Sequence, residues 1–157
     1  MARQLRPVEL EFVEVAPVRF FFEQEMSAAP EAVFAALADD VPGWSEWFAS
    51  VTSARPVDGG ARRDIRLKGG GRFLETVIAV KPPEVYGYRV DRTNAPGARA
   101  LAEEWRLIPS GAGTRVRWTF AADGTAAFRL VVRLARPGLG RAFRGAVTSL
   151  DRRLAAR

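Results

Sequence analysis

The chain contains Ala100-Leu101-Ala102-Glu103-Glu104-Trp105-Arg106-Leu107-Ile108, then Pro109-Ser110-Gly111-Ala112-Gly113, then Thr114-Arg115-Val116-Arg117-Trp118-Thr119-Phe120-Ala121. This stretch predicts a β-hairpin, because apolar and polar residues alternate on both sides of a turn rich in Pro and Gly. The apolar set of the second strand must face the core, namely Val116, Trp118 and Phe120. In the first strand Trp105 and Leu107 point the same way, and strict alternation takes Glu103 with them.

More strands precede this hairpin. The segments 51–57, 62–68, 72–80 and 85–92 each read as a strand and end in residues typical of turns, such as Gly69-Gly70-Gly71. The gaps are too short for crossover helices, so we expect an antiparallel sheet. Inward-facing apolar positions include Ile65 and Leu67 in one strand and Tyr86 and Tyr88 in another.

Helices are expected on both sides of this run. An aromatic strand at 18–25 comes first, followed by short helices near 30–38 and 42–48. From 125 to 156 apolar residues recur at intervals of three and four, which predicts a long amphipathic helix with a kink or short break at Pro137. This stripe comprises Phe128, Val131, Ala135, Leu139, Phe143, Ala146, Leu150 and Leu154.

The element order predicts one fold. We expect an α+β protein whose seven-stranded, curved antiparallel sheet wraps around a long C-terminal helix, with two short helices after the first strand. Residues 17–157 form a single domain, and residues 1–16 form an N-terminal arm or an extra edge strand. A hollow between the sheet and the last helix is the expected ligand cavity.

The composition excludes much chemistry. The 157 residues include neither Cys nor His, which removes thiolate and imidazole catalysis and their metal sites, so we expect no metal and no cofactor. The N-terminus lacks the apolar core of a secretory signal, and we expect a cytoplasmic protein. The net charge of +6 comes almost wholly from arginine. It permits an acidic partner, but no nucleic-acid-binding motif is present.

The chain resembles the SRPBCC superfamily, also called START-like or Bet v 1-like, and within it the bacterial polyketide cyclase/dehydrase branch. The likeness spans roughly residues 17–155 and rests on Ala29-Pro30-Glu31-Ala32-Val33-Phe34, Trp44-x-x-Trp47, Gly113-Thr114-Arg115-Val116-Arg117-Trp118 and the terminal helix. The resemblance implies a helix-grip fold around a cavity for a lipid-like or polyketide-like molecule. It implies no catalytic motif.

These expectations give a set of candidate ligand-binding residues: Phe34, Trp44, Trp47, Ile65, Leu67, Tyr86, Tyr88, Glu103, Trp105, Leu107, Val116, Trp118, Phe120, Val131, Ala135 and Leu139. Glu103 is the one candidate catalytic residue, because a carboxylate among aromatic rings has a raised pKa. The alternative is that Glu103 reaches water or pairs with an arginine. Trp44 and Trp47 form either a lid at the cavity mouth or a plug at one end of the sheet.

The sequence is consistent with three alternative functions. The first is binding of a small hydrophobic or amphipathic molecule. The second is a polyketide cyclase, aromatase or dehydratase that uses Glu103 and the tyrosines. The third is an interaction module in which Arg129, Arg133 and Arg136 meet an acidic carrier protein or an anionic membrane surface. A homodimer through a strand edge or residues 1–16 stays open.

Overall fold

The computed structural model describes residues 2–157 and contains the curved antiparallel sheet that the strand pattern predicts. Seven strands follow one another in the order β2-β8-β7-β6-β5-β4-β3, and β1 (Arg3–Gln4) pairs with the far end of β6. The seven strands are β2 (Val18–Met26), β3 (Val51–Val57), β4 (Arg62–Leu67), β5 (Arg72–Lys81), β6 (Val85–Thr93), β7 (Ala98–Ser110) and β8 (Gly113–Gly124).

The hairpin of β7 and β8 places the predicted residues on its inner face. Trp105 pairs with Trp118 and Glu103 with Phe120, so all four side chains belong to the concave face. The turn contains Gly111 at φ +58°, a conformation that favours glycine. The alternation in the sequence therefore predicted correctly which residues of this hairpin face inward.

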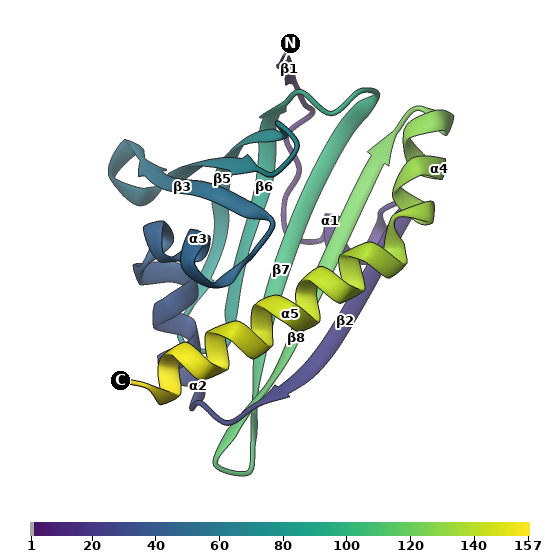
Figure 1. The fold of residues 1–157 in the computed structure, drawn as a ribbon. Coiled ribbons are helices and arrows are strands. Elements are labelled where there is room, and N and C mark those ends of the chain that lie inside the picture. The colour runs from purple at the N-terminus through teal and green to yellow at the C-terminus, as the bar shows by residue number, and fades with distance from the viewer. Residues whose placement is uncertain (1) are drawn as a thin grey trace.

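The long helix α5 (Arg136–Ala155) runs diagonally across the concave face of the sheet (Figure 1). Its buried stripe includes Phe143, Ala146, Val147 and Leu150. Near its far end Asp151 accepts hydrogen bonds from the backbone N–H groups of Ser27 and Ala28, which fix the helix to the loop after β2. The helix-grip architecture is thus confirmed.

The kink or short break expected near Pro137 is a short break, one residue long, at Ala135. The helix α4 (Ala126–Leu134) ends before Pro137, which occupies the first turn of α5, where no N–H is needed. In α4 only Phe128 and Val132 are buried. The helix α4 packs on the sheet through these two residues alone. The sequence pattern predicted an apolar stripe that continues in phase from α4 into α5, and this prediction was wrong.

A short connection closes one end of the sheet. It comprises α2 (Pro30–Phe34), a π-helical turn η1 (Ala35–Asp39), a 3-10 turn η2 (Val41–Gly43) and α3 (Trp44–Trp47), with a further 3-10 turn, η3 (Asp58–Gly60), between β3 and β4. The indole N–H of Trp44 donates a 2.9 Å hydrogen bond to the carbonyl of Leu37. This bond holds α3 against the preceding turn.

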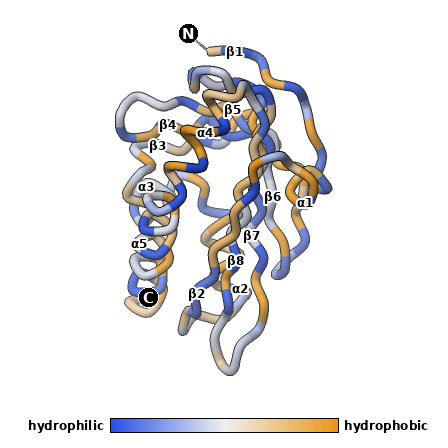
Figure 2. Tube along the Cα trace, turned by 90° about the vertical axis from the view of Figure 1, so that its right-hand side faces the viewer, coloured by the Kyte–Doolittle hydropathy of each residue, from blue (hydrophilic) through white to orange (hydrophobic). Residues whose placement is uncertain are grey.

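The N-terminal segment lies on the outer face of the sheet, opposite α5 (Figure 2). The helix α1 (Phe12–Val15) buries Phe12 and Val13 against the small side chains of Ala102 and Ala121. The segment thus covers an apolar outer surface that alanines make flat. Met1 lies outside the described residues.

Candidate functional site

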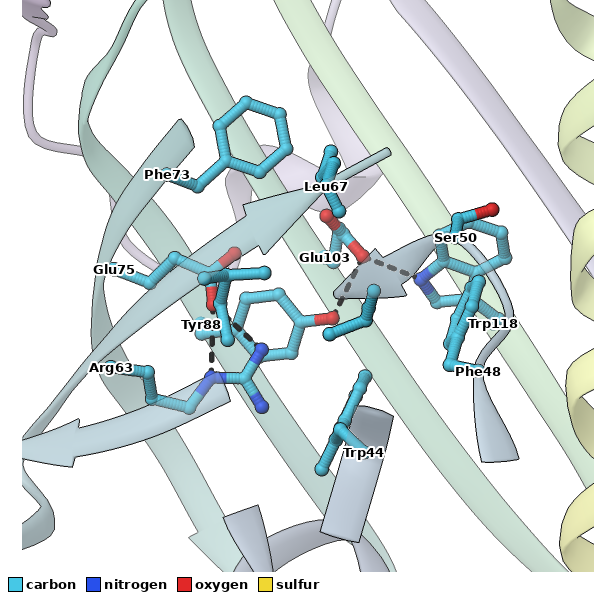
Figure 3. Close-up of a pocket in the computed structure, with 12 residues that line it drawn as sticks. Trp44, Phe48, Ser50, Arg63, Leu67, Phe73, Glu75, Tyr88, Glu103 and Trp118 are labelled. Atoms are coloured by element: carbon cyan, nitrogen blue, oxygen red, sulfur yellow. Dashed lines mark hydrogen bonds and ion pairs between the residues drawn. The ribbon is translucent and has the colours of Figure 1, made fainter. Parts of the chain in front are cut away.

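The candidate site is a cavity of about 110 Å³ inside the curl of the sheet (Figure 3). Its lining residues come from six strands, from α3 and from the segment after α3: Trp44, Phe48, Ser50, Val51, Arg63, Ile65, Leu67, Phe73, Glu75, Tyr88, Glu103 and Trp118. Most of them are buried, whereas Ser50, Leu67 and Phe73 are half-buried. Those three residues mark the side on which the cavity opens.

The expected position of the cavity needs a correction. We predicted it between the sheet and the C-terminal helix, but no residue of α4 or α5 lines it within residues 2–157. The space under α5 is filled by side chains, because Phe143 stacks on Trp118 with ring centroids 5.9 Å apart and Phe22 packs against both. The cavity lies instead between α3 and the sheet.

Six of the predicted residues line the cavity: Trp44, Ile65, Leu67, Tyr88, Glu103 and Trp118. Others lie in the surrounding core and do not reach the cavity, namely Phe34, Trp47, Tyr86, Trp105, Leu107 and Val116. Phe120 and Leu139 are partly buried at the edge of the same core. The role of all these residues in binding stays a prediction.

Two predicted residues lie outside the site altogether. Val131 is 63% exposed and Ala135 is also exposed. Both predictions rested on a helical stripe that continues past Pro137. The break before α5 turns α4 so that Val132 contacts the sheet in their place.

Arg63 and Glu75 are the most important lining residues that the sequence argument missed. In β4, Arg63 alternates with Ile65 and Leu67, which we had placed inward. In β5, Glu75 stands two residues after Phe73, which also faces the cavity. The period of two therefore carried the signal for Arg63 and Glu75, as it did for Glu103.

Arg63 is enclosed on every side. Its Nε and Nη2 donate hydrogen bonds of 2.9 and 2.6 Å to Oε1 of Glu75, and Nη1 lies 3.4 Å from the hydroxyl of Tyr86. The guanidinium carbon lies 4.4 Å from the ring centre of Trp44 and 4.1 Å from that of Tyr88. Aromatic faces attract such a cation, so this buried charge is both paired and stacked.

Glu103 is held by a second network. Its Oε1 accepts a 2.7 Å hydrogen bond from the hydroxyl of Tyr88 and a 2.8 Å bond from the indole of Trp118. The hydroxyl of Tyr88 in turn accepts a 3.2 Å bond from the indole of Trp105. The proposed alternatives for Glu103, exposure to water at a strand end or pairing with an arginine, do not describe it, since it is 8% exposed and bonded to aromatic side chains.

Burial governs the electrostatics of this cluster. Burial, together with the nearby charge of Glu103, raises the pKa of Glu75 to about 7 against the opposing effect of Arg63. Burial also raises the pKa of Glu103, against the hydrogen bonds from Tyr88 and Trp118 and the charge of Arg63. The pKa of Tyr88 is raised well above its usual value by burial and by Glu103. The site therefore combines an apolar wall with two carboxyl groups whose pKa values are raised, that of Glu75 to about 7.

The aromatic residues near α3 form a wall of the cavity. Trp44 and Trp47 are buried, with ring centroids 4.8 Å apart, and Trp44 also contacts Trp105 edge-on at 5.6 Å. Trp44 faces the cavity and Trp47 lies behind it. Of the two roles considered, this packing fits the plug.

The glycine turn after β4 is tethered near the opening. Gly69 and Gly70 have φ of +85° and +94°. The side chain of Asn94 donates a 2.9 Å hydrogen bond to the carbonyl of Gly70 and accepts a 3.0 Å bond from the backbone N–H of Arg72. The opening beside Leu67 and Phe73 is thus framed by a turn fixed to the end of β6.

Residues 18–155 match the family described as polyketide cyclase / dehydrase and lipid transport. The chain belongs to this family. Uncharacterised relatives in Mycobacterium tuberculosis and Mycobacterium bovis are 29% identical over 155 residues, which cover 96% of this chain and 92% of each relative. The expected membership of the SRPBCC superfamily is thereby confirmed.

Solved structures agree on the fold of this family member. The Zhui aromatase/cyclase of a Streptomyces species has a TM-score of 0.71 at 15% identity, covering 89% of this chain and 94% of that one. A START superfamily protein of Mycobacterium smegmatis has a TM-score of 0.66 at 12% identity, covering 84% of this chain and 98% of that one. At such identities these matches establish the fold alone. Family and fold together support a ligand-binding or cyclase role.

Proposed function

We propose that this protein binds one small apolar or amphipathic molecule in the cavity between α3 and the sheet. The observation that carries the proposal is the lining itself, in which aromatic and aliphatic side chains surround a few polar groups that point inward. Burial of apolar ligand surface contributes about 25 cal/mol per Å² before the costs of ordering. The small volume fits a ring system or the end of a chain.

A substitution at the opening tests this proposal. Ser50→Phe places a ring at the half-buried mouth, whereas Thr52→Phe places the same ring at an exposed position two residues along. A panel of naphthalene and phenylalkyl compounds is titrated while tryptophan fluorescence is followed, since Trp44 and Trp118 line the cavity. We expect saturable binding that S50F abolishes and T52F retains. Equal binding by all three proteins would place the ligand elsewhere.

A second candidate function is acid–base chemistry on a bound ketone, as in a cyclase. It is favoured by the 2.7 Å hydrogen bond between Tyr88 and Glu103 at the cavity wall and by the raised pKa of Glu103. Glu103 would take a proton from the carbon beside the carbonyl. The test is deuterium exchange into phenylbutanone, which should exceed the buffer rate and return to it in Glu103→Gln.

The surface of α4 supports a separate proposal, contact with an anionic membrane. Leu130, Val131 and Leu134 are 56%, 63% and 72% exposed on a helix that also carries Arg129 and Arg133. Exposed aliphatic side chains beside arginines suit an interfacial helix on acidic lipid. Arg136 lies close by, with its guanidinium 5.5 Å from the ring centre of Phe20. None of the helices in residues 2–157 is long and apolar enough to cross a bilayer.

Vesicle sedimentation separates this surface from a docking site for an acidic carrier protein. We expect binding to phosphatidylglycerol vesicles, little binding to phosphatidylcholine, and loss of binding in both Leu130→Ser/Leu134→Ser and Arg129→Glu/Arg133→Glu. If the serine variant binds as well as the wild type, the aliphatic residues do not insert. In that case the membrane proposal fails and a purely ionic partner replaces it.

A further inference from the structure

The lining of the cavity contains more acidic than basic side chains. Its charged lining residues, taken over residues 2–157, are Arg63, Glu75 and Glu103. With both carboxylates ionised, the enclosed cluster carries one net negative charge. The other ionisable lining group is the neutral hydroxyl of Tyr88. An isolated charge in such surroundings is costly, so the cluster must take up a proton or a counter-charge.

Each of the two carboxylates accepts hydrogen bonds from the protein through only one of its oxygens. Oε1 of Glu75 accepts both bonds from Arg63, and Oε1 of Glu103 accepts those from Tyr88 and Trp118. Neither Oε2 accepts a hydrogen bond from any residue in the range 2–157, and neither is fully enclosed by protein. In Figure 3 these oxygens point away from the bonded partners. Two acceptors on side chains that are 2% and 8% exposed therefore face the same cavity.

The arginine is not available to an acidic ligand. Its Nε and Nη2 are committed to Glu75, its Nη1 lies 3.4 Å from the hydroxyl of Tyr86, and the rings of Trp44 and Tyr88 lie 4.4 and 4.1 Å from its guanidinium carbon. A ligand carboxylate could pair with Arg63 only by displacing Glu75 into an apolar wall. It would also add a second unpaired negative charge.

We propose that the ligand carries a protonated amine, which the open oxygens of Glu75 and Glu103 bind while the aromatic wall holds its apolar body. The inference rests on the proposed function, since it names the ligand class for the same cavity. An ammonium group supplies up to three hydrogen-bond donors and one positive charge, which neutralises the cluster. The rings of Trp118 and Trp44 add further attraction for a cation.

In the empty protein a proton takes the place of this amine. Burial raises the pKa of Glu75 to about 7 and also raises that of Glu103, so Glu75 is partly protonated at pH 7. The charged or titratable groups that act on the pair are Arg63 on β4 and Tyr86, Tyr88 and Asp91 on β6, and Asp39 acts on Tyr86 alone. Amine binding should therefore release a proton, which binding of a neutral ligand should not.

Three compounds with one skeleton test the inference: phenylpropylamine, phenylpropanol and phenylpropanoic acid. Isothermal titration at pH 7 should give an amine affinity at least about tenfold above that of the alcohol, with the acid weakest. Repetition in buffers of different ionisation enthalpy should show proton release for the amine alone. Glu103→Gln should weaken amine binding about tenfold and leave alcohol binding nearly unchanged, because glutamine keeps an acceptor for Tyr88 and Trp118.

The outcomes separate this inference from the proposed function. If the alcohol or the acid binds as tightly as the amine, and Ser50→Phe abolishes that binding, the cavity binds ligands but does not select amines. If apolar compounds bind and the amine does not, the amine inference is wrong and the proposed function stands. If no compound of either panel binds, both the inference and the proposed function are wrong.

Discussion

The guanidinium of Arg63 donates two hydrogen bonds, 2.9 and 2.6 Å long, to a single oxygen of Glu75. This side-on pairing neutralises the arginine and leaves the other oxygen of Glu75 open to the cavity. The pair thus fixes the polar centre of the site, and Glu103 completes it from β7. Several properties of the protein should depend on this arrangement.

Stability should fall as the pH rises from about 4.5 to about 7. Glu75 has a pKa of about 7 in the folded protein against an ordinary value of 4.5, so the folded state binds more protons in this window and unfolding becomes easier as they are lost. The loss should be on the order of 3 kcal/mol, since one pKa unit corresponds to about 1.4 kcal/mol. Urea unfolding at a series of pH values measures it.

Glu103→Gln should flatten this pH dependence, because the charge of Glu103 contributes to the raised pKa of Glu75. The matched control is Glu104→Gln on the outer face of the same strand, where Glu104 pairs with Arg106. The control should keep the slope of the wild type. A steep slope that survives in Glu103→Gln would show that this carboxylate is not part of the titrating pair.

Arg63→Met should destabilise the protein by about 3–5 kcal/mol, because it removes the cation from a buried ion pair. The double variant Arg63→Met/Glu75→Met replaces both charges by apolar groups and should regain most of that loss. Denaturant unfolding at pH 7 gives both values. A double variant no more stable than the single one would mean that Arg63 and Glu75 stabilise the core by their packing and not by neutralising each other's charge.

Gly113→Ala should cost several kcal/mol, because an added Cβ would lie 2.0 Å from the carbonyl oxygen of Met26. Gly111→Ala, two residues earlier in the same turn, meets no neighbouring atom and should cost only about 1 kcal/mol for its positive φ. Thermal unfolding compares the two. Similar losses would indicate that the start of β8 can move away from the loop after β2.

Asn94→Ala should loosen the glycine turn at the cavity opening, since Asn94 bonds to Gly70 and Arg72. Loss of two hydrogen bonds should raise amide exchange at Gly70 and Arg72 about tenfold. Ser110→Ala, which removes a bond to Glu25 in a distant turn, serves as the control. Unchanged exchange in Asn94→Ala would show that other contacts hold the turn.

The sequence predicted the sheet, the hairpin of β7 and β8 and the inward position of Glu103, because alternation along a strand reports directly on its two faces. It did not predict where the cavity lies. Whether a hollow remains under α5 depends on how Phe143 and Phe22 stack on Trp118, and such packing has no period in the sequence. The exposure of Val131 was missed because Pro137 separates α4 from α5 and changes which residue meets the sheet.

Arg63 shows a second limit of prediction from the sequence. A rule that sends apolar residues inward and charged residues outward hides a buried ion pair, although strict alternation from Ile65 and Leu67 points to it. The covering of the outer face by α1 was likewise not predicted beyond an arm or edge strand. The sequence feature that indicates this covering is the set of small residues Ala100, Ala102 and Ala121, whose side chains leave room for Phe12 and Val13.

Native mass spectrometry tests the central claim, binding of a small molecule in the cavity, most directly. The wild type, Ser50→Phe and Thr52→Phe are examined as purified and after incubation with the apolar and amine panels, and any bound compound is extracted and identified. We predict a single added mass in the wild type and in Thr52→Phe that is absent in Ser50→Phe. The same adducts on all three proteins, or no adduct on any of them, would contradict binding at this cavity.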